Sequence, residues 1–133
     1  MPDRTIVKVE TGHDVITARV RGRMLAEELG FQMGDLVLIT TAISEVARNI
    51  VSYAERGGVE LLPLRGGPRT GIQIVARDTG PGIDDVPRAM RDGYSTGGGL
   101  GLGLPGCRRL MDDFEITSAA GTGTTVTMRK WLR

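Results

Sequence analysis

Residues 35–56 read DLVLITTAISEVARNIVSYAER and decide the fold, because their apolar side chains recur with the period of an amphipathic helix. At about 100° per residue these side chains fall within one stripe about 140° wide, which is typical of a helix that faces a core. The stripe consists of Leu36, Ile39, Ile43, Val46, Ala47, Ile50 and Tyr53. Asp35 is a preferred N-cap residue type, and the Gly57-Gly58 pair follows the last turn. We therefore predict a long helix that begins at Asp35.

Two polar residues, Glu45 and Asn49, lie at the edge of this stripe, one helical turn apart. Side chains at this spacing project together, with Cβ atoms about 5–6 Å apart. A carboxylate can accept a proton from an attacking hydroxyl, and an amide oxygen can coordinate Mg²⁺, which prefers oxygen ligands. The same pair occurs often by chance on a solvated helix face, so it does not establish a site by itself.

The segment before this helix predicts one strand and one further helix. Residues 4–10, RTIVKVE, favour a strand. In residues 12–31 apolar side chains recur at helical spacing, and Gly30 marks the end of the helix. The residues that carry this spacing are Ile16, Val20 and Met24.

On the other side of the long helix, residues 59–64 and 71–78 predict a β-hairpin joined by the turn-rich sequence RGGPRT. Asp78 closes the second strand and is followed by Thr79-Gly80-Pro81-Gly82. These residue types form tight turns for backbone reasons, so a turn is one interpretation. The other is a ligand site, in which the carboxylate accepts a hydrogen bond from an exocyclic amine. Gly80 and Gly82 would then let the ligand approach the backbone closely.

Residues 79–100 carry Gly, Pro and Asp without sustained periodicity, and loops of this length in compact domains are usually lids or binding loops. A short helix is expected around residues 86–90. Glycine then becomes frequent, since six of the chain's 20 glycines lie between Gly97 and Gly106. Backbone N–H groups of such a segment, running into a helix, form a cradle for an anion. A flexible linker is the alternative.

The glycine segment contains the pattern Gly-x-Gly-x-x-Gly at Gly101, Gly103 and Gly106, which we do not interpret as a dinucleotide or kinase phosphate loop. A loop precedes it rather than a strand, and the acidic residue about 20 positions later is missing. The chain is too short for the kinase signature set. A Walker A loop requires a lysine after its last glycine, and the only lysines are Lys8 and Lys130.

The C-terminal third predicts a third helix and a closing hairpin. Helical spacing runs through Cys107, Leu110, Met111 and Phe114, and Cys107 is expected to be a small core residue. FEITS and TTVTMRKWL flank the turn sequence AAGTG. Because two helices precede the strands instead of alternating with them, we expect an α+β two-layer sandwich. Its sheet would be mixed but mostly antiparallel, with helices covering one face.

Composition limits the classes of function. The chain has 133 residues, 40% of them apolar, which predicts one domain over residues 1–133 with a real core. A net charge of +1 favours neither nucleic acid nor an anionic membrane, so neither partner is expected. One cysteine and one histidine leave no disulfide framework and no cluster of soft metal ligands. The start, MPDRTIVKVE, has no apolar targeting segment, so we expect a cytoplasmic protein.

The order of these motifs is more specific than any one of them. The chain has Glu-x-x-x-Asn on a helix, Asp-x-Gly-x-Gly after a strand, a lid, a glycine cluster, and Gly-Thr-Gly-Thr near its end. This order resembles the GHKL ATPase superfamily, whose Bergerat fold is shared by gyrase and histidine kinases. ITTAISEVARNIV, DGYSTGGGLGLGLPG and KWLR are further similar to the switch kinases of the bacterial stressosome, relatives of the anti-sigma factor kinases. The resemblance implies an ATP lid at about residues 79–100.

The resemblance also implies a site for ATP and Mg²⁺. Glu45 would be the general base and Asn49 the Mg²⁺ ligand. Asp78 would take the adenine amino group, in a pocket that Gly80 and Gly82 shape.

Two further parts of the site follow from the same resemblance. The glycines that would cradle the phosphates are Gly99, Gly101 and Gly103, and Thr124 would approach the base. Several relatives place a Lys or Arg directly before the glycine cluster to meet the γ-phosphate. This chain has residues 94–96, Tyr-Ser-Thr, at that place, with Arg88 and Arg91 further upstream.

Two functions are compatible with these residues. In the first, the protein is a serine/threonine-protein kinase in which Glu45 deprotonates the hydroxyl of a partner. The resemblance implies that the partner is a STAS-domain scaffold or antagonist protein, and that the released kinase activates a PP2C-type phosphatase. In the second, the protein is an anti-sigma factor or another nucleotide-gated binding module with little kinase activity. A gyrase-like clamp needs a transducer domain, which a chain of this length does not hold.

Overall fold

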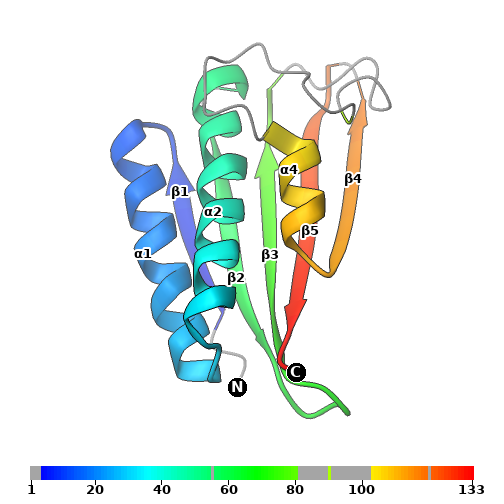
Figure 1. Ribbon diagram of the computed structural model, residues 1–133. Coiled ribbons are helices and arrows are strands. Elements are labelled where there is room, and N and C mark those ends of the chain that lie inside the picture. The colour runs from blue at the N-terminus through cyan, green and yellow to red at the C-terminus, as the bar shows by residue number, and fades with distance from the viewer. Residues whose placement is uncertain (1–3, 55, 81–89, 91–102, 120) are drawn as a thin grey trace.

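The structure is a two-layer α+β sandwich in which one antiparallel sheet carries helices on a single face (Figure 1). This computed structural model describes residues 4–54, 56–80, 90, 103–119 and 121–133. The elements are β1 (Thr5–Val9), α1 (Gly12–Leu29), α2 (Met33–Asn49), the π-helix η1 (Ile50–Ala54), β2 (Gly57–Leu64), β3 (Gly71–Asp78), α4 (Gly103–Leu110), β4 (Asp113–Ala119) and β5 (Gly123–Trp131). The predicted fold class is confirmed.

The five strands have the order β1-β2-β3-β5-β4. Every pairing between them is antiparallel, so the described part of the sheet lacks the parallel strand that a mixed sheet would have. Both predicted hairpins are present: β2 pairs with β3, and β4 pairs with β5. Because β5 lies between β3 and β4, the end of β3 and the start of β5 are neighbours, with Arg77 opposite Thr125.

The core lies between the sheet and the helices. Ile74 of β3, Met128 of β5, and Ile39 and Ile43 of α2 all have an exposed fraction of 0%. Burial of one such side chain contributes about 1.5–3 kcal/mol relative to leaving it in water. The helices α1 and α2 approach closely because Gly22 has no side chain, and a Cβ there would collide with Cδ1 of Ile43.

Helix α1 is present as predicted and ends at Gly30, whose φ of 99° is in the left-handed region that favours glycine. However, the apolar side chains of Ile16, Val20 and Met24 are exposed. The buried face contains small residues that allow close packing, and it consists of Val15, Ala18, Gly22, Leu25, Ala26 and Leu29. Helical spacing identified the helix, but it could not show which of two apolar stripes faces the core.

Helix α2 differs from the prediction at both ends. Its N-cap is Gln32, so Asp35 is not the cap but lies in the first turn, where a carboxylate interacts favourably with the helix dipole. At the other end the chain passes into η1, whose i→i+5 hydrogen bonds change the angular spacing of the side chains. Tyr53 is therefore 47% exposed instead of buried, whereas the other members of the predicted stripe are buried.

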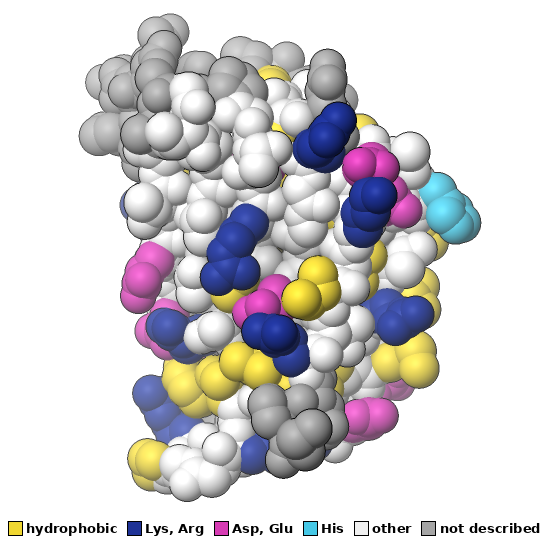
Figure 2. Space-filling model, turned by 180° about the vertical axis from the view of Figure 1, so that it is seen from behind, with side chains coloured by type: hydrophobic (Ala, Val, Ile, Leu, Met, Phe, Trp, Pro, Cys, Tyr) yellow, Lys and Arg dark blue, Asp and Glu magenta, His cyan; other side chains and the backbone are white. Residues whose placement is uncertain are grey.

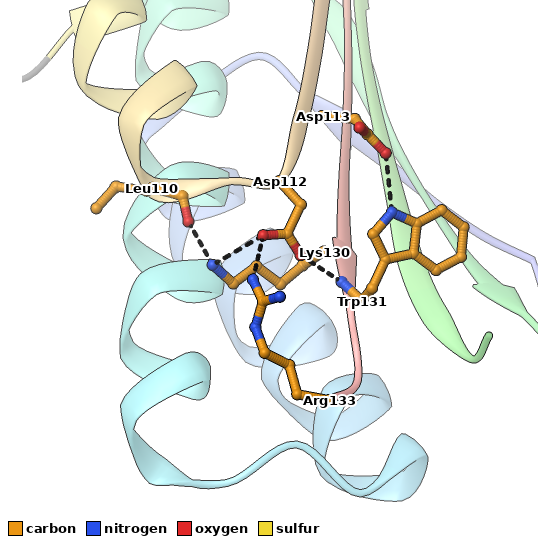
Figure 3. A network of polar contacts seen from close by, with 6 residues as sticks. All are labelled: Leu110, Asp112, Asp113, Lys130, Trp131 and Arg133. Atoms are coloured by element: carbon orange, nitrogen blue, oxygen red, sulfur yellow. Dashed lines mark hydrogen bonds and ion pairs between the residues drawn. The ribbon is translucent and has the colours of Figure 1, made fainter.

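The turn from α4 into β4 is held by a network around Lys130 of β5 (Figure 3). The Lys130 amine is buried, donates a hydrogen bond of 2.8 Å to the Leu110 carbonyl and lies 3.8 Å from the Asp112 carboxylate. Asp112 also accepts hydrogen bonds from the backbone of Trp131 at 2.8 Å and the side chain of Arg133 at 2.6 Å. The Lys130 amine thus satisfies the carbonyl of the last residue of α4.

Phe114 was predicted to continue the third helix, and this is wrong. It lies in β4, where it pairs with Met128. Its apolar side chain packs against the core from the strand. Phe114 also lies seven residues after Cys107, and this i, i+7 spacing made it look like part of the helix.

The face of the sheet opposite the helices carries charged, polar and apolar side chains (Figure 2). Its Glu60 lies 3.5 Å from Arg4 and 3.8 Å from Arg77. No helix among the described residues combines the length and the apolarity needed to cross a bilayer.

Candidate functional site

The predicted site residues come from segments that meet at one end of the sheet (Figure 1). The last turns of α2, η1, the end of β3, the start of α4 and the start of β5 all lie at this end. The fold thus brings together, at one end of the molecule, segments that are far apart in the sequence.

Glu45 lies on the buried side of α2, and only 5% of the residue is exposed. The Nη1 atom of Arg48, one turn further along the helix, lies 3.2 Å from its Oε1 atom and donates a hydrogen bond to it. The Arg48 side chain is itself 42% exposed, so the ion pair lies at the boundary between the core and solvent. A buried carboxylate needs such a partner, because removing an unpaired charge from water is costly.

Cys107 shows that Glu45 lies beside α4. The Sγ atom of Cys107 is buried and donates a weak hydrogen bond to the carbonyl of Ala42 at 3.7 Å. Burial raises the pKa of the Cys107 thiol to about 12, and the negative charge of Glu45 is a second cause. Cys107 is therefore a protonated core residue, as predicted, and α4 packs on α2 at the turn that carries Glu45.

Asn49 is the last residue of α2 before η1 begins, and it is partly buried. It therefore lies one turn beyond Glu45 on the same helix, as the sequence predicted. Within the described residues, its side-chain amide makes no hydrogen bond, so the amide oxygen is available to a ligand. The π-helix that follows departs from the regular helical hydrogen-bond pattern at this residue, and π-helical turns often occur at functional sites.

Asp78 ties two strands together. Its Oδ1 atom accepts a hydrogen bond from the backbone N–H of Gly80 at 3.0 Å and a second from that of Thr124 at 3.2 Å. The first bond is the local turn that Asp and Gly predict, and the second links the end of β3 to the start of β5. Both use the same oxygen. Among the described residues, the second oxygen has no hydrogen-bond partner.

The backbone around Asp78 is packed so tightly that neither Gly80 nor Gly123 has room for a side chain. A Cβ on Gly80 would lie 2.6 Å from the Cβ of Ala54 in η1, so packing alone explains this glycine. Gly123 has a φ of 95°, and a Cβ there would collide with the Asp78 carbonyl oxygen. The hydroxyl of Thr124 is 2.8 Å from that of Ser118 across the hairpin.

Part of the predicted site lies outside the described residues. This applies to most of the lid and to two of the phosphate-cradle glycines. The residues concerned are Gly82, Arg88, Arg91, residues 94–96, Gly99 and Gly101. It also applies to the short helix expected around residues 86–90, of which only Met90 is described. Gly103 is described and begins α4 with a φ of 53°. The start of α4 lies at the same end of the sheet as the last turn of α2 and the end of β3 (Figure 1).

Three residues of this region were not singled out in the sequence. Arg48 falls between Glu45 and Asn49, and its i+3 spacing from an acidic residue is a signal that could have identified the ion pair. Gly123 packs against the Asp78 carbonyl, and the hydroxyl of Ser118 contacts that of Thr124. The Gly-Thr-Gly-Thr motif contains Gly123, but no local pattern identifies Ser118, because its contact forms only when β4 and β5 pair.

Comparison with known proteins supports the same family as the motif order. A family model described as "Histidine kinase-like ATPase domain" matches residues 11–130. Serine/threonine-protein kinase RsbT of Bacillus subtilis is 51% identical to this chain over 135 residues, which covers 100% of both proteins. The anti-sigma F factor of Caldanaerobacter subterraneus subsp. tengcongensis is 28% identical over 86% of this chain and 83% of its own length.

A solved structure has the same fold. The crystal structure of the RsbU and RsbW domains of a Mycobacterium tuberculosis protein matches with a TM-score of 0.68 and 22% sequence identity. The match covers 100% of this chain and 33% of that one. The family match spans most of the chain and agrees with the fold and with the motif order. The chain therefore belongs to the histidine kinase-like ATPase family, the GHKL family that its motifs resemble.

Proposed function

We propose that this protein is an ATP-dependent serine/threonine-protein kinase that acts as a switch protein in a stressosome-type signalling cascade. The observation that carries the proposal is the position of Glu45, a buried carboxylate one helical turn from Asn49 at the end of the sheet where Asp78 lies. The full-length similarity to a protein named as a serine/threonine-protein kinase supports the same activity.

ATP would bind across the end of the sheet. The second carboxylate oxygen of Asp78 would accept a hydrogen bond from the adenine amino group while Oδ1 keeps its two backbone N–H partners. Thr124, whose backbone is tied to Asp78, would approach the base. The phosphates would extend toward the start of α4, where Gly103 lies. Gly99 and Gly101, which precede it in the sequence, would add backbone N–H groups to the cradle.

In the transfer step Glu45 accepts the proton of a serine or threonine hydroxyl of the partner protein. The hydroxyl oxygen forms a bond to the γ-phosphorus as the bond from that phosphorus to the bridging oxygen of ADP breaks. The products are a phosphorylated partner and ADP, and Glu45 then releases its proton to water. Because Glu45 is buried beside α4, little water competes for its carboxylate in this step.

The residues present fit Mg²⁺ as a companion of ATP. The described residues hold no group of three or more His, Cys, Asp or Glu that could bind a metal by themselves. Asn49 offers one free amide oxygen, and Mg²⁺ is usually held by one or two protein oxygens together with phosphates and water. When bound, the ion would neutralise charge on the phosphates.

The partners follow from the resemblance to stressosome switch kinases. We propose that the substrate is a STAS-domain scaffold or antagonist protein and that the released kinase activates a PP2C-type phosphatase. We place this activity in the cytoplasm, where ATP is supplied.

A second candidate function is supported by the anti-sigma F factors among the relatives. In this alternative the nucleotide controls binding to a partner, such as a sigma factor, and little phosphate is transferred. The site geometry is the same, because it is the partner that decides the chemistry.

The test is transfer of labelled γ-phosphate from Mg·ATP to STAS-domain proteins of the same organism. The wild-type protein should label a serine or threonine of one of them. Glu45→Ala should lower the rate at least about 100-fold, the usual range for a general base, while ATP still binds. Glu27→Ala, an exposed acid on α1, is the matched control and should leave the rate unchanged.

Each outcome favours one account. Transfer that survives Glu45→Ala would remove the role of Glu45 as base. ATP binding and a stable partner complex without any label in the wild type would favour the nucleotide-gated binding module.

A further inference from the structure

Arg48 is the one charged side chain in contact with Glu45 among the described residues, and no role follows for it from the motifs above. We propose that Arg48 is a positioning residue, which holds the Glu45 carboxylate in the orientation that proton transfer requires. This inference rests on the proposed kinase function and adds to it the group that controls the base.

The contact fixes one oxygen of the carboxylate. Nη1 of Arg48 donates to Oε1 of Glu45 at 3.2 Å, and Oε2 makes no hydrogen bond to any other described residue. Rotation about the last side-chain bond of a glutamate is soft. The carboxylate therefore needs a contact that stops this rotation. By holding Oε1, the Arg48 guanidinium also fixes the direction in which Oε2 points.

The surroundings of Glu45 make this contact more important than an ordinary surface ion pair. The Glu45 side chain is 6% exposed, so little water is available to solvate its charge. Cys107 on α4 also lies near Glu45, but its thiol remains protonated and brings no positive charge. Arg48 thus provides the compensating charge among the described residues.

The chain contains a matched control for this pair. Arg23 on α1 lies 3.7 Å from Glu27 in an i, i+4 pair, and its side chain is 43% exposed, against 42% for Arg48. The side chains of the two arginines are exposed to nearly the same extent, and each pairs with a glutamate on its own helix. They differ in that Glu27 is 53% exposed, whereas Glu45 is buried and lies at the site.

The experiment compares Arg48→Gln, Arg48→Lys and Arg23→Gln. It measures steady-state transfer of labelled γ-phosphate to the STAS-domain protein that the wild type phosphorylates, and ATP affinity by calorimetry. Arg48→Gln should lower kcat about 10- to 100-fold, because a misplaced reacting group costs that much, while ATP affinity changes less than about threefold. Arg48→Lys keeps the charge and should recover most of kcat. Arg23→Gln should match the wild type.

Three results would overturn the inference. The first is an unchanged kcat in Arg48→Gln. The second is a loss of ATP affinity equal to the loss of kcat, which would mean that Arg48 binds the nucleotide instead of positioning Glu45. The third is an Arg48→Lys variant that folds and is no better than Arg48→Gln. Failure of the kinase proposal itself would look different, since the wild-type protein would then transfer no phosphate at all.

Discussion

At the scale of single residues, Asp78 combines a structural and a proposed binding role in one side chain. Its Oδ1 atom closes the turn to Gly80 and holds Thr124, whereas the proposed contact to adenine uses the other oxygen. The two roles can be separated chemically, because asparagine keeps the Oδ1 acceptor and replaces the other oxygen with an amino group.

Asp78→Asn should therefore leave the fold intact and weaken ATP binding. The new amino group would face the adenine amino group, so two donors would meet without an acceptor. An unmet hydrogen bond costs about 1–3 kcal/mol, which corresponds to roughly a tenfold loss of affinity or more. Calorimetric titration with ATP and a thermal melt of each protein measure the two effects. Asp35→Asn, in the first turn of α2, is the control, and equal ATP affinity in both variants would reduce Asp78 to a turn residue.

At the scale of elements, the end of α4 depends on a single buried amine. Lys130 satisfies the Leu110 carbonyl and faces Asp112, and it lies on β5, so it joins a helix end to the sheet (Figure 3). The Asp112 carboxylate keeps Arg133 and the Trp131 backbone as partners without it.

Lys130→Met should lower the free energy of unfolding by about 1–3 kcal/mol, because the Leu110 carbonyl loses its donor. The cost stays below that of a fully buried ion pair, since Asp112 remains paired. Urea denaturation measures the change. Lys8→Met is the matched control: the Lys8 side chain is 77% exposed and its amine pairs with Glu10 at the surface, so the effect should lie within about 0.5 kcal/mol. Equal stability of the Lys130 and Lys8 variants would contradict the role of the network.

The same elements show how far the sequence alone could reach. The stripe on α2 is wide and unambiguous, so the helix and its buried face could be predicted, with the exception of Tyr53. The buried face of α1 could not be predicted, because the helix has two apolar stripes and the close packing at Gly22 that selects one of them depends on α2. Phe114 was assigned to a helix because spacing cannot detect that the helix ends at Leu110, where Lys130 of β5 binds the last carbonyl.

At the scale of the whole molecule, the strand order β1-β2-β3-β5-β4 determines which residues meet at the candidate site. It brings Thr124 beside Asp78, and it sets the end of β3 close to η1, where Ala54 packs on Gly80. The sequence predicted Glu45, Asn49 and Asp78 through motif order, because each belongs to a local pattern. It did not reveal Arg48 or Ser118, whose contacts depend on burial and strand pairing.

We propose that these segments together form one ATP site at the end of the sheet. The most direct test is a crystal structure with Mg²⁺ and a non-hydrolysable ATP analogue. We expect the adenine amino group within hydrogen-bond distance of the Asp78 carboxylate, with the phosphates between Asn49 and the start of α4. A nucleotide bound elsewhere, such as on the open face of the sheet, or a base turned away from Asp78, would contradict the account.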